Sequence, residues 1–179
     1  MTIDRKTPLH DVAFEVCTAL DRVGTRAVLT GGSAATFYAP SAVQSQDLDF
    51  VLTLGGTGGE PLRALEDLGY TRAGQHYTHA VNPYFLEFPQ GPLAIGDELI
   101  ETWDTPHEGD RLLHVLLPTD SCRDRLMWFY LEKDRGALEQ ALAVYAAQAG
   151  RIDLARIRRW SRKEGATEGF QEFERLAGG

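Results

Sequence analysis

Apolar residues recur at steps of three or four near the N-terminus, which is the pattern of an amphipathic helix. Gly24 ends this pattern, as glycine commonly does just beyond a helix. The sequence therefore predicts a first helix with one face turned toward a core. The residues that carry the pattern are Leu9, Val12, Val16, Leu20 and Val23.

Short apolar runs and turn residues follow this helix. Residues 26–30 predict a strand, and the segment 31–39 predicts a glycine turn that leads into a short helix. Residues 47–53 predict a second strand, with its aspartates on one face and Leu48, Val51 or their neighbours turned toward the core.

The middle of the chain alternates loops with extended stretches. A glycine-rich loop leads into a helix that has proline near its first turn and glycine just past its end. Two extended stretches come next and are predicted to pair, followed by an irregular acidic segment and a last strand closed by Pro118. The corresponding ranges are 54–60, 60–69, 75–81, 84–89, 97–110 and 111–118.

From Thr119 onward the apolar period becomes helical. A first helix at 118–133 is predicted to begin with Thr119 or Asp120 as its cap, and an alanine-rich helix ends at Gly150. Two further helices are predicted at 153–165 and 167–177. We therefore predict an α+β fold, with an α/β core at 1–118 and a helical part at 119–179.

Composition narrows the class of protein. The chain has 179 residues, of which 43% are hydrophobic and 25% charged, so it is expected to be an ordinary globular chain with one core. It holds neither an apolar run long enough to span a membrane nor a hydrophobic N-terminal signal, so we expect a cytoplasmic protein without a membrane partner. Cys17 and Cys122 lack CxxC spacing and are expected to be buried free thiols.

Charge is shared unevenly along the chain, whose net charge is −8. Residues 1–110 hold 16 acidic and 6 basic side chains, whereas residues 111–179 hold 10 acidic and 12 basic ones. The acidic N-terminal part would repel a bare phosphate backbone unless cations or the C-terminal arginines intervene.

Asp47 and Asp49 are the strongest candidates for chemistry. Side chains two apart on a strand share a face, with Cα atoms about 6.5 to 7 Å apart. Two carboxylates so close and partly buried disfavour each other's ionisation unless a cation lies between them. Mg²⁺ suits such a pair, because it is commonly held by one or two carboxylates together with substrate phosphates.

The glycine turn before this strand fits a phosphate group. Gly31 and Gly32 let the backbone approach a bulky anion, the first amides of the helix point toward it, and the Ser33 hydroxyl can add a hydrogen bond. A strand, a glycine turn, a helix and a strand with an aspartate pair together suit a metal-bound triphosphate.

The segment LTGGSAATFYAPSAVQSQDLDF resembles the signature of the DNA polymerase beta-like nucleotidyltransferase superfamily. More narrowly, it is similar to the minimal nucleotidyltransferases of bacterial toxin–antitoxin and abortive-infection systems, in which Ser or Thr stands two residues before the first aspartate. Ser45 occupies that place here. The resemblance covers roughly residues 26–89 and implies a small mixed β-sheet with helices on one side.

The resemblance also implies a third carboxylate on a later strand, and Glu87 is the best match. The alternative is a charge on the outer face of an edge strand. A cation for the triphosphate would come from Lys133, Arg135 or another C-terminal arginine, although Lys133 and Arg135 also suit a solvated turn between two helices. The arginine that often precedes the Ser-x-Asp element is absent, since Val43 and Gln44 stand there.

Taken together, the sequence predicts a nucleotidyltransferase that uses Mg²⁺ or Mn²⁺ and an NTP. Asp47, Asp49 and Glu87 would be the catalytic and metal-binding residues, and Glu87 would also take the acceptor's proton. The acceptor could be an RNA end, a protein or a small molecule, and a cognate protein partner is possible for this type. The residues expected to bind the nucleotide are Gly31, Gly32, Ser33, Ser45 and Lys133.

Two other functions stay open. The same fold with an inactive site would be a binding or antitoxin-like module. A dinucleotide binder that uses the GGTGGE loop fits less well, because the loop lacks GxGxxG spacing. The arginine-rich helix at 153–165 suits either a solvated face around Trp160 or a contact with RNA or protein. All five histidines lack metal-ligand spacing and are taken as ordinary residues.

Overall fold

The computed structural model describes residues 2–54 and 59–178. Most of the GGTGGE loop lies outside these residues. The helices are α1 Leu9–Arg22, α2 Gly31–Tyr38, α3 Glu60–Asp67, α4 Pro118–Glu132, α5 Arg135–Ala147, α6 Leu154–Lys163 and α7 Thr167–Ala177, with a 3₁₀ turn at Ala149–Arg151. The strands are β1 Arg26–Leu29, β2 Asp47–Leu54, β3 Tyr70–Ala73, β4 His76–His79, β5 Phe85–Glu87, β6 Ala94–Ile95, β7 Glu98–Leu99, β8 Trp103–Asp104, β9 His107–Glu108, β10 Arg111–Leu112 and β11 His114–Leu116.

Seven of the strands form one mixed sheet in the order β3-β4-β5-β2-β1-β11-β8. β2 runs parallel to β5, and β1 runs parallel to β11, while the other neighbours are antiparallel. The central strands β2 and β1 therefore lie beside strands that come much later in the chain. The predicted pairing of 75–81 with 84–89 is confirmed as β4 with β5.

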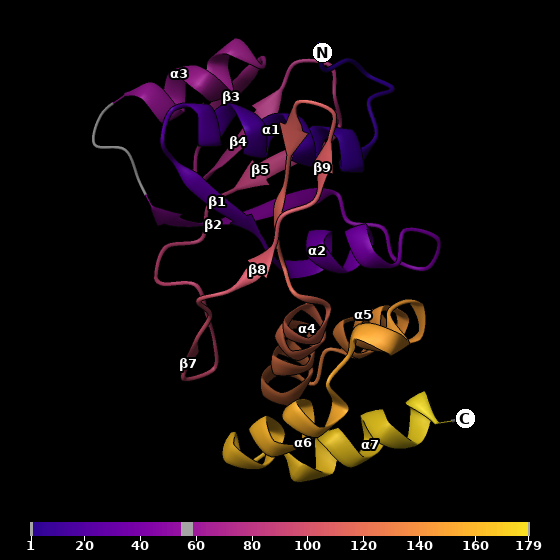
Figure 1. Cartoon of the computed structure of the whole chain (residues 1–179). Helices are drawn as coiled ribbons and strands as arrows, with labels where there is room; N and C mark the ends of the chain where they lie inside the picture. Colours follow the sequence, from indigo (N-terminus) through magenta and orange to yellow (C-terminus); the bar gives the residue numbers. More distant parts are fainter. Residues whose placement is uncertain (1, 55–58, 179) are drawn as a thin grey trace.

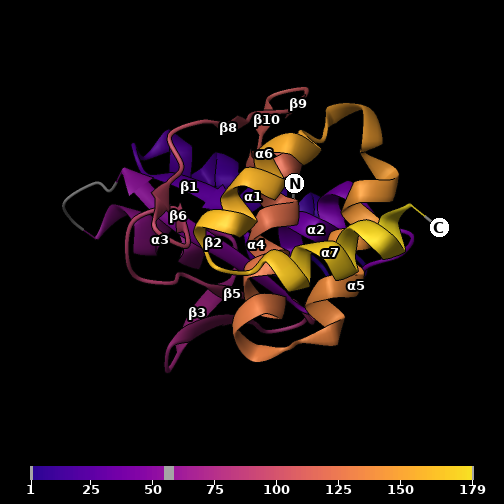
Figure 2. The ribbon, with the colours of Figure 1, turned by 90° about the horizontal axis from the view of Figure 1, so that it is seen from below.

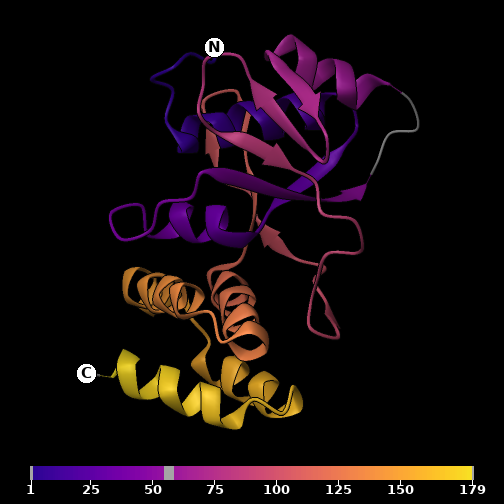
Figure 3. The same ribbon diagram turned by 180° about the vertical axis from the view of Figure 1, so that it is seen from behind.

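The sheet separates two groups of helices. α1 and α3 lie together on one side, and α4 to α7 form a helical layer on the other side (Figure 1). The view from behind shows the same arrangement (Figure 3), and the view from below shows α6 and α7 in front of the rest (Figure 2). α2 contacts β2, α4 and α5, so it joins the sheet to the helical layer. The predicted α+β class is confirmed.

The alternation along β2 assigns its two faces. Leu48 and Phe50 are fully buried, and Leu52 on the same face borders a hollow with Leu20 of α1 and Leu65 of α3. Val51 instead shares the opposite face with the aspartates and is partly buried against the core there, so Leu48 and Val51 reach the core from different faces. The aspartates therefore face α4 rather than α1 and α3.

Several element boundaries differ from the sequence prediction. The strand predicted at 111–118 is two short strands, and β3 was not predicted. Pro118 does not close a strand but is the first residue of α4, which has no side-chain cap, so the predicted Thr119 or Asp120 cap is wrong. The helix predicted to reach Gly150 ends at Ala147. The predicted division at 118/119 stays a prediction.

Two smaller predictions are confirmed. Cys17 and Cys122 are buried free thiols, and burial raises the pKa of Cys17 to about 12. In α6, Ile157 and Trp160 are buried, and Arg158 pairs with Glu174 of α7. The face of α6 around Trp160 thus packs within the protein.

Candidate active site

Three carboxylates meet on the face of the sheet that looks toward α4. Asp47 and Asp49 share this face of β2, and Asp49 is aligned with Glu87 on the parallel strand β5. One carboxylate oxygen from each residue lies within 4.8 Å of the others. β5 has β4 on one side and β2 on the other, so Glu87 does not lie on an edge strand. The structure thus brings together the three predicted carboxylates.

These carboxylates repel one another. Burial, followed by the charges of Asp47 and Glu87, raises the pKa of Asp49 to about 7, while Arg125 acts in the opposite direction. Arg125 is also engaged by its neighbour, since its Nη2 donates to Asp124 Oδ2 at 2.6 Å. The cluster is therefore short of positive charge. Three half-buried carboxylates with this deficit form the donor set that a hard divalent cation such as Mg²⁺ prefers.

Gly31 brings the start of α2 against the aspartates. Its φ of +64° lies in the left-handed region, and a Cβ added there would lie 2.1 Å from Asp49 Oδ2. The Thr30 N–H donates to the Asp49 carbonyl at 2.8 Å, which fixes this turn to β2. A side chain at 31 would therefore have to displace the Asp49 carboxylate from this position. The first amides of α2 consequently begin beside the carboxylates.

The two serines hold different parts of the site. Ser45 Oγ donates to Asp47 Oδ1 at 2.5 Å, so it orients this carboxylate. Gly32 lies next to Ser45, since a Cβ at Gly32 would be 3.3 Å from Ser45 Oγ. Ser33 is fully buried, and its hydroxyl donates to the Thr30 carbonyl and accepts from the Asp49 N–H. This arrangement does not support the predicted contact of the Ser33 hydroxyl with a phosphate; Ser33 positions Asp49 instead.

A hollow of about 390 Å³ opens at this cluster. It is lined by Gly31, Asp49 and Glu87 from the sheet side and by Asp124, Arg125 and Trp128 from α4. Lys133 lies elsewhere, at the C-terminal end of α4, and borders another hollow between α4 and α7. The sequence prediction covered Arg125 only as an unnamed C-terminal arginine and missed Trp128. Their spacing of three on a helix was a usable signal, because it places both side chains on one face.

A larger hollow of about 640 Å³ adjoins the site at Ser45. Its lining includes His10, Phe37 and Tyr84 but none of the three carboxylates. Volume alone therefore does not identify the candidate site, which rests on the carboxylates and the glycine turn.

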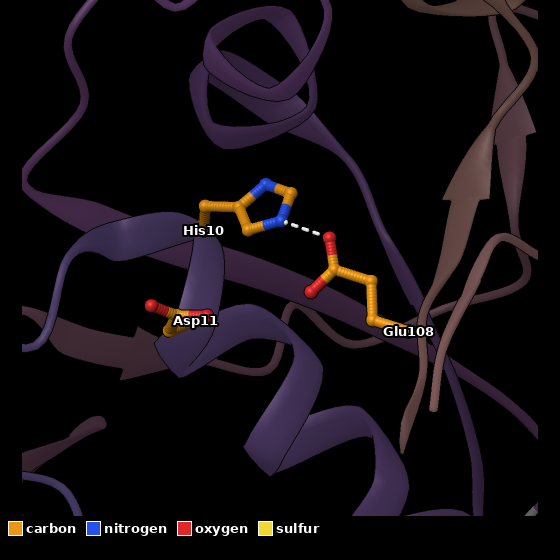
Figure 4. Close-up of side chains that lie close together, drawn as sticks. All are labelled: His10, Asp11 and Glu108. Carbon is orange, nitrogen blue, oxygen red and sulfur yellow. Dashed lines mark hydrogen bonds and ion pairs between the residues drawn. The ribbon is translucent and has the colours of Figure 1, made fainter. Parts of the chain in front are cut away.

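A second group with metal-ligand spacing joins His10, Asp11 and Glu108. His10 and Glu108 point toward each other (Figure 4), with His10 Nε2 2.7 Å from Glu108 Oε1. Arg111 supplies the positive charge here, since its guanidinium lies 2.7 Å from Glu108 and 3.0 Å from Asp11. We therefore interpret this group as an ion-pair network that joins α1 to the β9–β10 hairpin, which accords with the prediction that His10 is an ordinary residue.

No protein-family model matches the chain, and no curated protein matches it. Within the part of the chain that the structure describes, no helix is both long and apolar enough to cross a membrane.

Solved structures do resemble this chain. An antigenic nucleotidyltransferase-like protein from Paracoccidioides brasiliensis superposes with a TM-score of 0.62 at 14% sequence identity, over 94% of each chain. The antibiotic-resistance factor ANT(2'')-Ia gives a TM-score of 0.49 at 14% identity, over 88% of this chain and 94% of that one. Its complex with adenylyl-2''-tobramycin gives 0.49 at 15% identity, over 85% and 95%. The first of these similarities, which extends over nearly the whole chain, shows that this protein has a nucleotidyltransferase-like fold.

Proposed function

We propose that this protein is a metal-dependent nucleotidyltransferase, which transfers an NMP group from an NTP to an acceptor hydroxyl and releases pyrophosphate. The observation that carries the proposal is the meeting of Asp47, Asp49 and Glu87 beside a glycine turn that begins α2. The nucleotidyltransferase-like fold supports it. Neither the carboxylates nor the turn alone would suffice, since each is common in proteins of other functions.

The three carboxylates would hold Mg²⁺ or Mn²⁺. The pKa of Asp49 is raised by burial and by the negative charge that gathers there, and a bound cation would offset that charge. When bound, such ions neutralise negative charge that develops on the reacting phosphate. Ser45 would keep Asp47 in its ligating orientation through their hydrogen bond. The proposal fits the residues present, because all three side chains offer oxygen donors.

The start of α2 would hold the phosphates. Backbone amides there are free of intrahelical partners, and the helix dipole favours an anion. Gly31 and Gly32 leave room for this approach. Arg125 lines the same hollow as the carboxylates, so among Lys133, Arg135 and the other C-terminal arginines that the sequence left open, we assign the phosphate contact to Arg125.

The proposed reaction exchanges one bond to the α-phosphorus for another. The acceptor oxygen forms a bond to the α-phosphorus as the bond to the pyrophosphate oxygen breaks, and Glu87 takes the proton from the acceptor hydroxyl. The acceptor is an RNA end, a protein or a small molecule. Membership of a toxin–antitoxin system, with a cognate protein partner, remains a prediction from the sequence resemblance.

The test is transfer of label. The purified protein is incubated with Mg²⁺, a cell extract and each α-³²P-labelled NTP in turn, and the labelled fraction is identified. We expect label from at least one NTP, lost in Asp49→Asn and in excess EDTA but kept in Asp110→Asn, a control that removes an exposed carboxylate. A folded protein that transfers no label would contradict the proposal and favour an inactive binding or antitoxin-like module.

A further inference from the structure

Trp128 is unusually exposed for a tryptophan. Trp160 is buried, whereas Trp128 leaves 51% of its surface exposed. Large aromatic side chains contribute most when their rings are covered, so an open indole beside a reactive cluster points to a missing partner. Trp128 lines the hollow that also contains Asp49 and Glu87. The open ring therefore faces the proposed reaction site rather than a remote surface.

The rest of the hollow offers an apolar wall. The segment that follows β5 contributes Pro89, Pro92, Leu93 and Ile95 to its lining. This segment and the β6–β7 hairpin lie beside α4, which carries Trp128 (Figures 1 and 3). The volume of about 390 Å³ falls within the range of small-ligand sites, about 300 to 1,000 Å³. A flat apolar ring is the shape that such a lining accommodates.

This wall is tied to α4 by buried charge. Arg123 of α4 has no exposed surface, and its Nη2 donates to Glu98 of β7 at 2.5 Å. Arg156 reaches the other oxygen of Glu98 at 3.3 Å. Within the hairpin, the Ile100 N–H donates to the Leu93 carbonyl at 2.9 Å. The ion pairs of Arg123 and Arg156 with Glu98 therefore fix the position of the apolar segment relative to α4, which carries Trp128.

The face of α4 also has a polarity. Arg125 and Trp128 are three residues apart, so they lie on one helix face about one turn, or ~5 Å, from each other. A nucleotide has phosphates at one end and a flat base at the other. Arg125, next to the carboxylate cluster, suits the phosphate end of a nucleotide, and the open ring of Trp128 suits its base.

We propose that Trp128 stacks the base of the NTP, with Pro92 and Leu93 on the wall of the same hollow, and that this stacking favours purine over pyrimidine nucleotides. The inference rests on the proposed function. Purines are favoured because a two-ring base covers more of the indole than a one-ring base does. Trp128 is therefore assigned as a nucleotide-binding residue.

A different use of Trp128 would be docking of a protein on α4. Leu131, one turn further along α4, is 66% exposed. It borders a different hollow, the one between α4 and α7 that also includes Lys133. A docking surface would need both residues, whereas base stacking needs Trp128 alone. Leu131→Ala is thus the matched control, since it removes an exposed apolar side chain from the same helix.

The experiment measures binding by calorimetry in Mg²⁺, with α,β-methylene ATP, the corresponding CTP analogue and inorganic triphosphate as probes. Triphosphate carries the tail without the base. Trp128→Ala is expected to weaken the ATP analogue about 5- to 150-fold, the range for loss of one base–aromatic stack. It should leave triphosphate binding unchanged. Leu131→Ala should leave both unchanged, and the wild type should bind the ATP analogue more tightly than the CTP analogue.

The outcomes separate the inference from the proposed function. If the wild type binds the ATP analogue and Trp128→Ala binds it equally well, the stacking inference is overturned while the proposed function stands. Equal weakening of the ATP analogue and triphosphate would also overturn it, because the loss would not concern the base. If the wild type binds neither probe, the proposed function fails together with the inference.

Discussion

Two clusters of acidic residues in this molecule differ in how their negative charge is balanced. Asp120 and Glu98 share the guanidinium groups of Arg123 and Arg156. Burial alone would raise the pKa of Glu98, but the two arginines outweigh it and hold this pKa below its ordinary value. Asp47, Asp49 and Glu87 have Arg125 nearby, and the pKa of Asp49 is nevertheless raised.

We interpret this difference as one between a cluster that joins parts of the fold and a candidate functional cluster. Where the chain supplies arginines, as around Asp120, the charges join elements of the fold. Arg111 does the same for Asp11 and Glu108. Where the carboxylates outnumber the cations beside a glycine turn, the remaining charge is expected to come from outside the chain, as a divalent ion.

The largest effect on stability is expected when the internal cation is removed. Arg123→Met leaves Asp120, which is 1% exposed, as a buried carboxylate short of a partner. Breaking such a pair costs about 3–5 kcal/mol, measured as the free energy of unfolding in denaturant. Arg135→Met, which breaks an exposed pair with Glu172, should cost at most about 1 kcal/mol. Equal costs for the two variants would contradict the structural role of the Asp120 cluster.

Gly31→Ala should damage ligand binding more than folding. Its backbone penalty is about 1–2 kcal/mol, since φ is +64°, and the new methyl group displaces the Asp49 carboxylate. Gly24→Ala is the matched control: its φ is +73°, and no atom lies within 4 Å of the added Cβ. We expect similar unfolding free energies for the two variants but loss of Mg²⁺-dependent nucleotide binding only at 31. Binding that survives Gly31→Ala would argue against the assigned position of Asp49.

A smaller effect concerns pH. Because the folded-state pKa of Asp49 is raised from 3.8 to about 7, the folded chain holds this proton more tightly than the unfolded chain. The metal-free protein thus loses stability at this group as pH rises from about 4 through 7. Asp49→Asn should melt above the wild type at pH 8, and the gap should narrow by pH 5. If the difference in melting temperature between the variant and the wild type does not depend on pH, the pKa of Asp49 is not raised in the folded protein.

Local patterns predicted the part of the fold that carries the site. The 3.6-residue period of α1, the glycine turn before α2 and the alternation along β2 each depend on neighbouring residues. β3 was not predicted, because Tyr70–Ala73 mixes polar and apolar residues with little pattern and becomes a strand by pairing with β4. The split of 111–118 likewise follows from separate partners, β9 for β10 and β1 with β8 for β11.

The site was predictable only in part. The spacing of Asp47 and Asp49 indicated a shared face, and family resemblance suggested Glu87, which β5 then places beside Asp49. The direction of the Ser33 hydroxyl depends on how the turn meets β2, and the approach of Arg125 and Trp128 depends on how α4 packs below the sheet. The spacing of Arg125 and Trp128 indicates a shared helix face, but the sequence does not show which part of the fold that face meets.

The most direct test of the central claim is a melting experiment with Mn²⁺ and α,β-methylene ATP. The account predicts that the two together raise the melting temperature of the wild type more than either alone, by about 5–10 °C at ligand concentrations near 100 times Kd. The rise should vanish in Asp47→Ala and in Asp49→Ala. If neither ligand changes the wild-type melting temperature, or if the two variants respond as the wild type does, the assignment of Asp47 and Asp49 to a metal-bound nucleotide is contradicted.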